Sequence, residues 1–276
     1  MWTDRRVIVA GGTAGFGLVL GRHLARAGAR VLLVGRSAEG VRRALAVCDA
    51  DATIQGLAAD LQRPGEGNRV AGESLRLLGG IDDLFYCVGR SGRAAILRTG
   101  REDLEAYLEA NLLAAVEITR AVVDDVALSR GHLVYVGSLA GKLVTPFMGP
   151  YAVAKAALAA YVDAVRLEVR SRGVHVLLVS PGPIARAASD PAEERSGDRY
   201  AAEIAAAGLP AEATGPGGTS AITPLDPDSL ASSVLAACRR RVSELTIPRR
   251  ASLLAGLIEW FPDLGRWLLA RVTRRR

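Results

Sequence analysis

Aromatic side chains are scarce in this chain, at 5% of its 276 residues, and cysteine and histidine occur only three times each. Cys48, Cys87 and Cys238 show neither metal nor redox spacing, and the histidines form no cluster with acids or cysteines. We therefore expect no metal site. Reduced, unpaired cysteines are typical of a cytoplasmic protein, and we expect that compartment.

The sequence also lacks long apolar runs and internal repeats. No uninterrupted apolar stretch approaches the roughly 18 residues that are needed to span a bilayer. The N-terminus has a basic start and an apolar stretch, but Gly11 and Gly12 interrupt that stretch after a few residues. This interruption argues against a signal peptide.

Positive charge is concentrated at one end of the chain. The formal net charge is +6, yet residues 239–276 hold ten arginines and three acidic residues, and the rest holds 25 basic and 26 acidic residues. The main part of the chain is therefore close to neutral. It predicts no general nucleic-acid-binding surface.

Hydrophobic residues (50%) and glycines (30) are abundant. This composition and length suit one large α/β domain with a sizeable core. Short apolar runs alternate with helical patterns, as expected for parallel strands joined by helices. We predict strands at residues 6–10, 30–35, 52–59, 83–88, 131–137, 173–179 and 244–247.

A glycine-rich turn follows the first predicted strand and precedes an apolar helix. Backbone N–H groups and the helix dipole at such a turn point at an anion, and glycine lets the backbone approach it closely. Glycine stands at positions 11, 15 and 17. Three glycines with this spacing between a strand and a helix make a plain tight turn without a ligand the weaker interpretation. The turn predicts a phosphate-binding site.

A second functional stretch lies between residues 137 and 155. Ser138 ends a predicted strand, and Tyr151 and Lys155 are four residues apart, so they share one face of the following helix. A phenol with a pKa of about 10 is a poor acid or base at neutral pH, but a nearby cation favours the phenolate. Lys155 can supply that cation, and Ser138 can hold a substrate carbonyl oxygen. An ordinary packing tyrosine with a solvated lysine is the alternative when the pair is taken alone.

Ser138 with Tyr151-x-x-x-Lys155, together with the glycine turn, resembles the short-chain dehydrogenase/reductase family of the classical type. The resemblance covers about residues 5–248. It implies a Rossmann-type doubly wound α/β sheet of about seven parallel strands, in the order 3-2-1-4-5-6-7, with helices on both faces. It also implies NADPH-dependent reduction of a ketone or aldehyde to an alcohol by hydride transfer, with Tyr151 as the proton donor. Lys155 would hold the nicotinamide ribose, and Asn111 would support a proton relay.

Arg36 indicates NADP(H) as the cofactor. Enzymes that use NAD commonly carry an acid near the end of the second strand, and Gly35 and Arg36 offer none. Arg36 can meet a 2′-phosphate with two parallel hydrogen bonds; a solvated arginine at a helix start is the alternative. By the same resemblance, Asp60 accepts a hydrogen bond from adenine, and Gly89 allows close approach of the cofactor.

Besides the catalytic group of Ser138, Tyr151, Lys155 and Asn111, the expected site residues fall into two groups. The cofactor-binding residues are Gly11, Thr13, Gly15, Phe16, Gly17, Arg36, Asp60, Leu61, Gly89, Lys155, Pro181, Gly182 and Ile184. The substrate-pocket residues are Leu139, Leu143, Phe147 and Met148, which favour an apolar, lipid-like or polyketide-like ketone.

Three places depart from the family pattern. Ala10 replaces a leading threonine, Tyr86 to Gly89 reads Tyr-Cys-Val-Gly in place of Asn-Asn-Ala-Gly, and Arg186 stands where the family often has threonine. The departures at Tyr86-Cys87 and Arg186 keep a second hypothesis open, a non-catalytic NADP-binding scaffold or sensor. The reverse reaction, oxidation of an alcohol, would use the same residues.

We divide the chain into a Rossmann domain, 1–248, and a C-terminal extension, 249–276. The domain includes a lid at about 185–227 with a helix at 195–207. The extension combines an apolar helical stripe, interrupted at Pro262, with arginines. We predict ordered helix packed on the body or on a second subunit; the alternative is contact with an anionic membrane surface. By the resemblance, the helices at 104–128 and 151–172 would form the interface of a homodimer or homotetramer.

Overall fold

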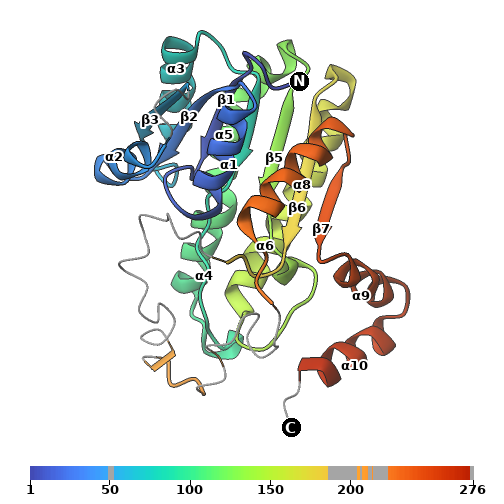
Figure 1. The fold of residues 1–276 in the computed structure, drawn as a ribbon. Coiled ribbons are helices and arrows are strands. Elements are labelled where there is room, and N and C mark those ends of the chain that lie inside the picture. The colour runs from blue at the N-terminus through green and yellow to red at the C-terminus, as the bar shows by residue number, and fades with distance from the viewer. Residues whose placement is uncertain (49–52, 186–203, 206, 211–212, 214–222, 274–276) are drawn as a thin grey trace.

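A seven-stranded parallel sheet forms the centre of the molecule (Figure 1). The computed structural model describes residues 1–48, 53–185, 204–205, 207–210, 213 and 223–273. The strand order, β3-β2-β1-β4-β5-β6-β7, confirms the predicted fold class. The strands are β1 (Arg6–Ala10), β2 (Arg30–Gly35), β3 (Ile54–Ala58), β4 (Asp83–Tyr86), β5 (His132–Val136), β6 (His175–Pro181) and β7 (Glu244–Ile247).

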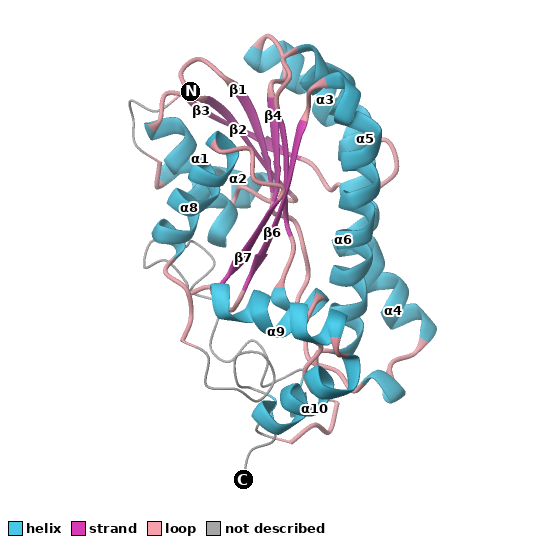
Figure 2. Ribbon diagram, turned by 90° about the vertical axis from the view of Figure 1, so that its right-hand side faces the viewer, coloured by secondary structure: helices cyan, strands magenta, loops and turns pink. Residues whose placement is uncertain are grey.

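Helices cover both faces of the sheet (Figure 2). One face carries α1 (Gly15–Arg26), α2 (Ala38–Ala46) and α8 (Pro227–Arg239), and the other carries α3 (Glu66–Leu78), α5 (Ala114–Leu128) and α6 (Gly149–Val169). Successive strand residues point to opposite faces, so Ile8 and Ala10 enter one hydrophobic core while Val7 and Val9 enter the other. Because both faces are covered, the central strands read as continuous apolar runs.

All strands point the same way, so their carboxyl ends meet at one edge of the sheet, the lower edge in Figure 1. The helix α4 (Arg101–Leu108) lies at this end of the molecule. Between α4 and α5, residues Glu109–Leu113 form a π-helical turn, whereas the sequence predicted mainly regular helix there. Single π-helical turns are frequent at functional sites, and Asn111 lies in the middle of this one.

Buried charged groups tie the strands together at the opposite, amino edge. Arg5 donates to both carboxylate oxygens of Asp83 at 2.5 and 2.8 Å. The backbone N–H of His132 donates to the same carboxylate at 2.9 Å, and the His132 ring lies 2.7 Å from it. These contacts join the start of β1 to β4 and β5, and no polar atom of the fully buried Asp83 carboxylate is left without a partner.

His175 lies beside this network at the start of β6. Its Nε2 atom is 2.8 Å from the carbonyl oxygen of Val242. Burial lowers the pKa of His175 to about 4, and the nearby His132, Arg241 and Arg166 act in the same direction. The folded protein therefore holds His175 in its neutral form near neutral pH.

Two helices follow β7, α9 (Arg249–Trp260) and α10 (Pro262–Thr273), and the break between them falls at Pro262, as the sequence predicts. The helices pack closely, since a Cβ atom on Gly265 would lie 2.7 Å from the Cα atom of Ile258. Of the helices that the structure describes, none has the length and apolar character needed to cross a membrane.

Most of the predicted lid lies outside the described residues, including Arg186 and nearly all of the helix predicted at 195–207. The parts that are described contact the body of the protein. Ile184 pairs with Leu225 in an isolated parallel bridge, and the carbonyl of Ala213 accepts a hydrogen bond from Arg93 Nε at 3.0 Å.

Candidate active site

A cavity of 1740 Å³ lies at the carboxyl edge of the sheet. Its wall includes the glycine turn after β1, the ends of the central strands, the first turns of α6 and the inner side of the C-terminal helices. Doubly wound sheets bind ligands at this edge, where the strand order reverses. Here the order reverses between β1 and β4, and residues from both sides of that point line the cavity.

Nearly all of the predicted site residues share this cavity. Its wall contains Gly11, Thr13, Gly15, Phe16, Gly17, Arg36, Asp60, Leu61, Gly89, Asn111, Ser138, Leu139, Leu143, Met148, Tyr151, Lys155, Pro181, Gly182 and Ile184. Phe147 was expected in the substrate pocket but is not part of the wall. Its backbone is in the left-handed region, with φ 63°, which few non-glycine residues adopt, and its carbonyl accepts a hydrogen bond from the N–H of Ala94 at 2.9 Å.

The glycine turn is closed so tightly that it excludes side chains. Gly11 has φ 75°, and a Cβ atom on it would lie 2.9 Å from backbone atoms of Cys87 and Val88. A Cβ atom on Gly17 would lie 2.2 Å from the carbonyl oxygen of Gly11. The turn therefore folds back against the end of β4 and presents bare backbone to the cavity beside the N-terminus of α1. That geometry suits a phosphate group.

One end of the cavity carries a cation where β2 stops. Arg36 is exposed at the cavity wall and has no ion-pair partner among the residues that the structure describes. The preceding residue must be small, because a Cβ atom on Gly35 would lie 2.1 Å from Thr13 Oγ1. Ser37 then begins α2, and its Oγ accepts a hydrogen bond from the N–H of Gly40 at 3.1 Å.

Asp60 reaches the same cavity from the loop after β3. Its Oδ1 accepts from the backbone N–H of Gln62 at 3.3 Å, and its Oδ2 lies 3.8 Å from Arg63 Nε. Its own backbone N–H donates to Glu66 at 3.2 Å. These contacts hold the loop so that Asp60 and Leu61 face the cavity.

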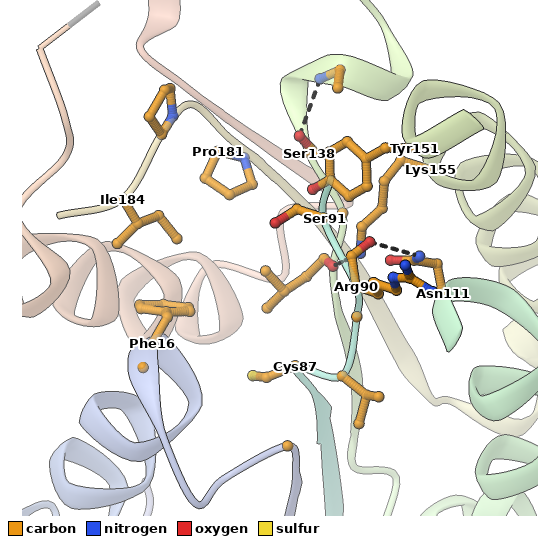
Figure 3. Close-up of a pocket in the computed structure, with 18 of the residues that line it drawn as sticks. Phe16, Cys87, Arg90, Ser91, Asn111, Ser138, Tyr151, Lys155, Pro181 and Ile184 are labelled. Atoms are coloured by element: carbon orange, nitrogen blue, oxygen red, sulfur yellow. Dashed lines mark hydrogen bonds between the residues drawn. The ribbon is translucent and has the colours of Figure 1, made fainter. Parts of the chain in front are cut away.

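Ser138, Tyr151 and Lys155 gather on one side of the cavity (Figure 3). Ser138 follows β5, and its Oγ accepts from the N–H of Ala140 at 3.1 Å, which leaves its O–H able to donate. Lys155 is 4% exposed, and its Nζ donates to the carbonyl of Val136 at 3.1 Å and lies 5.9 Å from the centre of the Tyr151 ring. A hydroxyl, a phenol and an ammonium group thus meet at one place.

Burial changes the acid–base behaviour of this corner. Desolvation lowers the pKa of Lys155 to about 8, although Cys87 opposes the shift. Burial also raises the pKa of the Cys87 thiol to about 12, so Cys87 remains neutral beside the ammonium. A lysine with a pKa near the working pH can hold and release a proton, as a relay requires.

Asn111 completes the site from the π-helical turn. Its Nδ2 donates to the carbonyls of Tyr107 at 2.9 Å and Arg90 at 3.0 Å, which orients the amide. Its Oδ1 is buried without a hydrogen-bond partner among the described residues. A Cβ atom on Gly89 would lie 2.8 Å from this Oδ1 and 3.1 Å from Lys155 Nζ. The absence of a side chain at Gly89 therefore leaves space for a water between an unsatisfied acceptor and the ammonium.

The departure at Tyr86 lies away from the cavity. Tyr86 is fully buried in the core beneath α5, with its ring centre 6.1 Å from that of Tyr135. Burial raises the pKa of its phenol well above the usual range. Neighbouring strand residues face opposite sides, so Cys87 meets the cavity while Tyr86 fills the core. This substitution leaves the cavity wall open to a ligand.

Several residues of the cavity wall were not predicted from the sequence, and two groups among them are notable. Arg90, Ser91 and Arg93 directly follow β4, and their place after the carboxyl end of a buried strand is the signal that would have found them. The second group lies on the C-terminal helices, where no local pattern distinguishes a side that faces the cavity. It consists of Arg250, Ala251, Leu254, Leu269 and Thr273.

Known proteins share both the sequence pattern and the fold. A family model described as short chain dehydrogenase matches residues 5–196. Dehydrogenase/reductase SDR family member 7B of Rattus norvegicus is 32% identical over 204 residues, which are 71% of this chain and 63% of that protein. Ketoacyl reductase HetN of Nostoc sp. is 28% identical over 189 residues, 67% of this chain and 65% of that protein. The match thus spans less than two thirds of either relative.

A solved structure agrees at the level of the fold. A short-chain dehydrogenase from Streptomyces avermitilis superposes with a TM-score of 0.75 at 22% identity, over 96% of this chain and 98% of that chain. With a family model that matches most of the chain, the assignment no longer depends on isolated motifs. The chain belongs to the short-chain dehydrogenase family, oxidoreductases that use NAD(H) or NADP(H).

Proposed function

We propose that this protein is an NADPH-dependent reductase that converts an apolar ketone or aldehyde to an alcohol. The observation that carries the proposal is the convergence of Ser138, Tyr151, Lys155 and Asn111 in one cavity at the carboxyl edge of the sheet. A chain that only bound the nucleotide would need the glycine turn but would have no need for this polar set. The convergence therefore favours turnover over a scaffold or sensor.

The shape of the cavity wall fits a dinucleotide. Gly11, Gly15 and Gly17 present bare backbone at the N-terminus of α1, where a pyrophosphate would be held. Asp60 lies in the cavity wall and would accept from the adenine amino group, while Gly89 leaves room beside Lys155 for the nicotinamide ribose. When bound, the reduced nicotinamide supplies the hydride that reduces the carbonyl carbon.

Ser138 and Tyr151 act on the carbonyl oxygen of the substrate. Because Ser138 Oγ already accepts from Ala140, its own proton is available to the substrate oxygen and orients it. Tyr151 donates its proton to that oxygen as negative charge develops there. General acid catalysis of this kind contributes roughly 10²- to 10⁴-fold to a rate.

Lys155 and Asn111 return the proton to Tyr151. The pKa of Lys155, lowered to about 8 by burial, lets its ammonium release a proton toward the phenolate at modest free-energy cost. A water held by the unsatisfied Oδ1 of Asn111 would reprotonate Lys155. Hydrogen-bonded chains of this kind polarise one another in a buried site.

The choice of NADPH over NADH depends on Arg36. It stands in the cavity wall at the end of β2 without an acidic partner among the described residues, and Gly35 has no room for a carboxylate while Thr13 is present. A 2′-phosphate would supply the missing anion. NADH has a 2′-hydroxyl in place of this phosphate, and β2 ends without a carboxylate that could accept a hydrogen bond from that hydroxyl.

The substrate end of the cavity is apolar. Leu139, Leu143 and Met148 form one part of the wall, and Leu254 and Leu269 of the C-terminal helices form another. Such a surface binds hydrocarbon in preference to polar groups. It favours a lipid-like or polyketide-like ketone, a class in keeping with the name of the ketoacyl reductase relative.

Tyr151→Phe tests the proposed reaction. Wild-type protein is mixed with NADPH and a panel of medium-chain, aromatic and 3-oxoacyl ketones, and cofactor consumption is followed by absorbance. Tyr151→Phe should lower turnover by roughly 10²- to 10⁴-fold while NADPH binding and the melting temperature stay unchanged. Tyr161→Phe, on the same helix but outside the cavity wall, is the matched control.

The outcomes separate the alternatives. If Tyr151→Phe turned over substrate as fast as the wild-type protein, the proton that reaches the substrate oxygen would come from another group. NADPH binding without consumption across the panel would favour the scaffold or sensor. Activity confined to an alcohol with NADP⁺ would reverse the direction and leave the residue roles intact.

Pairing of two copies through α5 and α6 is part of this proposal. Both helices expose large apolar side chains, Leu128 at 87% and Leu167 at 74%. Covering them would remove apolar surface from water. Light scattering of the purified protein measures the mass directly, and a monomer at micromolar concentration would contradict the pairing.

A further inference from the structure

The two C-terminal helices expose a set of large apolar side chains. We call this set the apolar tail face; it consists of Leu253, Trp260, Phe261, Leu264 and Trp267, which are 76%, 82%, 61%, 53% and 57% exposed. The chain has three tryptophans, and the third, Trp2, is 5% exposed. Scattered exposed leucines need no explanation, but three exposed aromatic side chains on one pair of helices indicate a surface that is covered in use.

The same helices carry positive charge next to the apolar tail face. Arg249, Arg250, Arg266 and Arg271 are all exposed, and no ion pair holds any of them within the part of the chain that the structure describes. The Arg271 guanidinium lies over the Trp267 ring, 5.4 Å from its centre. Tryptophan and phenylalanine beside arginine are the composition of helices that lie in the headgroup region of a bilayer.

The inner sides of these helices belong to the cavity. Arg250, Ala251 and Leu254 of α9 and Leu269 and Thr273 of α10 line its wall, so Arg249, Arg266 and Arg271 are the arginines that remain outside it. Figure 2 shows both helices beyond the carboxyl edge of the sheet, the edge at which the cavity lies. Two other exposed apolar side chains follow strands that end at the same edge of the sheet. Leu97, after β4, is 97% exposed, and Val144, after β5, is 60% exposed.

We propose that α9 and α10 dock this protein on an anionic lipid surface, with the apolar tail face among the headgroups and the arginines against lipid phosphates. The helices would lie in the plane of the surface, since neither can cross it. Each exposed apolar group gains by leaving water, and each arginine gains from the negative surface potential.

Charge decides against a second copy of this chain as the cover. Two copies that met through the apolar tail face by two-fold symmetry would bring the outer arginines of one, Arg249, Arg266 and Arg271, into the same interface as those of the other. The described residues of the two helices include only two acids, Glu259 and Asp263. Like charges in an interface are unfavourable, whereas an anionic bilayer supplies the opposite charge over the whole surface.

Docking in this orientation places the cavity wall formed by α9 and α10 next to the lipid. For an apolar substrate, the route from bilayer to cavity would not cross water. This consequence depends on the proposed function, but the docking itself does not, so binding to vesicles tests it without any turnover.

The test is vesicle sedimentation of the full-length protein. Vesicles of phosphatidylcholine alone are compared with vesicles of three parts phosphatidylcholine to one part phosphatidylglycerol, at low and high salt. We expect binding to the anionic vesicles at low salt and release at high salt, because salt screens surface charge. Tryptophan emission should shift to shorter wavelength and be quenched by lipids that carry a spin label, since the tail holds the two exposed tryptophans.

Variants assign the binding to this surface. Arg266→Gln with Arg271→Gln should weaken binding roughly fivefold per arginine, about 25-fold for the pair, from about 1 kcal/mol for each basic residue near an anionic surface. Arg239→Gln with Arg240→Gln, exposed at the end of α8, makes the same change in net charge and should leave binding unchanged.

A second set of variants removes apolar groups. Trp260→Ser with Phe261→Ser should abolish sedimentation, whereas Leu45→Ser with Leu75→Ser, partly exposed on α2 and α3, should not. Wild-type protein that stays in solution with anionic vesicles, or aromatic-to-serine variants that bind as wild type does, would overturn the proposal. A dimer that these variants convert to monomer, without vesicle binding, would identify a second copy as the cover. NADPH binding, measured on every variant, shows whether the nucleotide site is intact.

Discussion

Arg36→Asp should change the preference of this protein between NADPH and NADH. Arg36 lies at the cavity wall after β2, is exposed, and has no ion-pair partner among the described residues. A charge-assisted hydrogen bond contributes about 1.5–3 kcal/mol, and exposure to solvent favours the lower figure. Loss of the arginine should therefore raise the Kd for NADPH by about tenfold, since 1.4 kcal/mol is one decade.

The introduced carboxylate adds repulsion from the 2′-phosphate. Two unit charges about 4 Å apart in water interact by about 1 kcal/mol, which is roughly another fivefold. The expected total is a rise of about 50-fold in the Kd for NADPH, with little change for NADH, whose 2′-hydroxyl carries no charge. Fluorescence titration of the reduced nicotinamide measures both constants without knowledge of the substrate.

Arg42→Asp is the matched control for long-range charge. Arg42 is 75% exposed on the adjoining helix α2 and pairs with Glu39, so this variant makes the same change in net charge without touching the cavity wall. It should leave both constants within about twofold. Equal losses for NADPH and NADH in Arg36→Asp, or the same loss in both variants, would refute a 2′-phosphate contact.

Three further predictions concern other parts of the molecule. Gly89→Ala should lower turnover by roughly 10- to 100-fold, because the new methyl group would lie 2.8 Å from Asn111 Oδ1 and 3.1 Å from Lys155 Nζ. The control Gly72→Ala, whose methyl group would meet nothing within 4 Å, should keep the wild-type rate. If Gly89→Ala also kept the wild-type rate, the proposed proton relay through Asn111 and Lys155 would be wrong. The pKa of His175 is lowered to about 4 in the folded protein, whereas in the unfolded chain it is about 6.5. As the pH falls from about 6.5 to about 4, the unfolded chain therefore binds a proton at His175 and the folded protein does not. The free energy of unfolding should fall by up to about 3 kcal/mol over this range. His175→Gln should flatten that dependence in thermal melts, and an unchanged slope would assign it to other groups. Removal of α9 and α10 should lower the melting temperature and open the substrate end of the cavity, and an unchanged melt with unchanged substrate preference would show that these helices are no part of the wall.

The fold was predictable because its strands are buried on both sides. A parallel strand between two helical layers must be apolar throughout, so runs such as residues 31–34 and 176–179, both Val-Leu-Leu-Val, could be located without knowledge of their partners. The ends of strands were less predictable, since pairing depends on neighbours. β4 stops at Tyr86, two residues before the predicted end, and β6 continues to Pro181, two residues beyond it.

The glycine turn and the Tyr151–Lys155 pair were predictable because their geometry is local. Conformational freedom at Gly11 and the one-turn spacing of the pair follow from backbone rules within a few residues. The π-helical turn at Asn111 was not predictable from periodicity, because a single inserted residue hardly changes the apolar repeat. The inner side of α9 and α10 was hidden for another reason: a helix with apolar residues around much of its circumference does not reveal which side faces protein.

The contact between Gly35 and Thr13 bears on how this protein could evolve another cofactor preference. An acid at position 35 is the ordinary route to NAD, yet its Cβ atom would meet Thr13 at Oγ1 (2.1 Å), Cγ2 (2.4 Å) and Cβ (2.8 Å). Alanine at position 13 would still leave the last of these contacts, so only glycine there clears the space. The two positions are therefore coupled, because an acid at position 35 would collide with Thr13 unless Thr13→Gly accompanies it. Mutations in contact combine non-additively, so a gain of NAD affinity through an acid at position 35 requires both substitutions, whereas a change at Arg36 alone acts only on the affinity for NADPH.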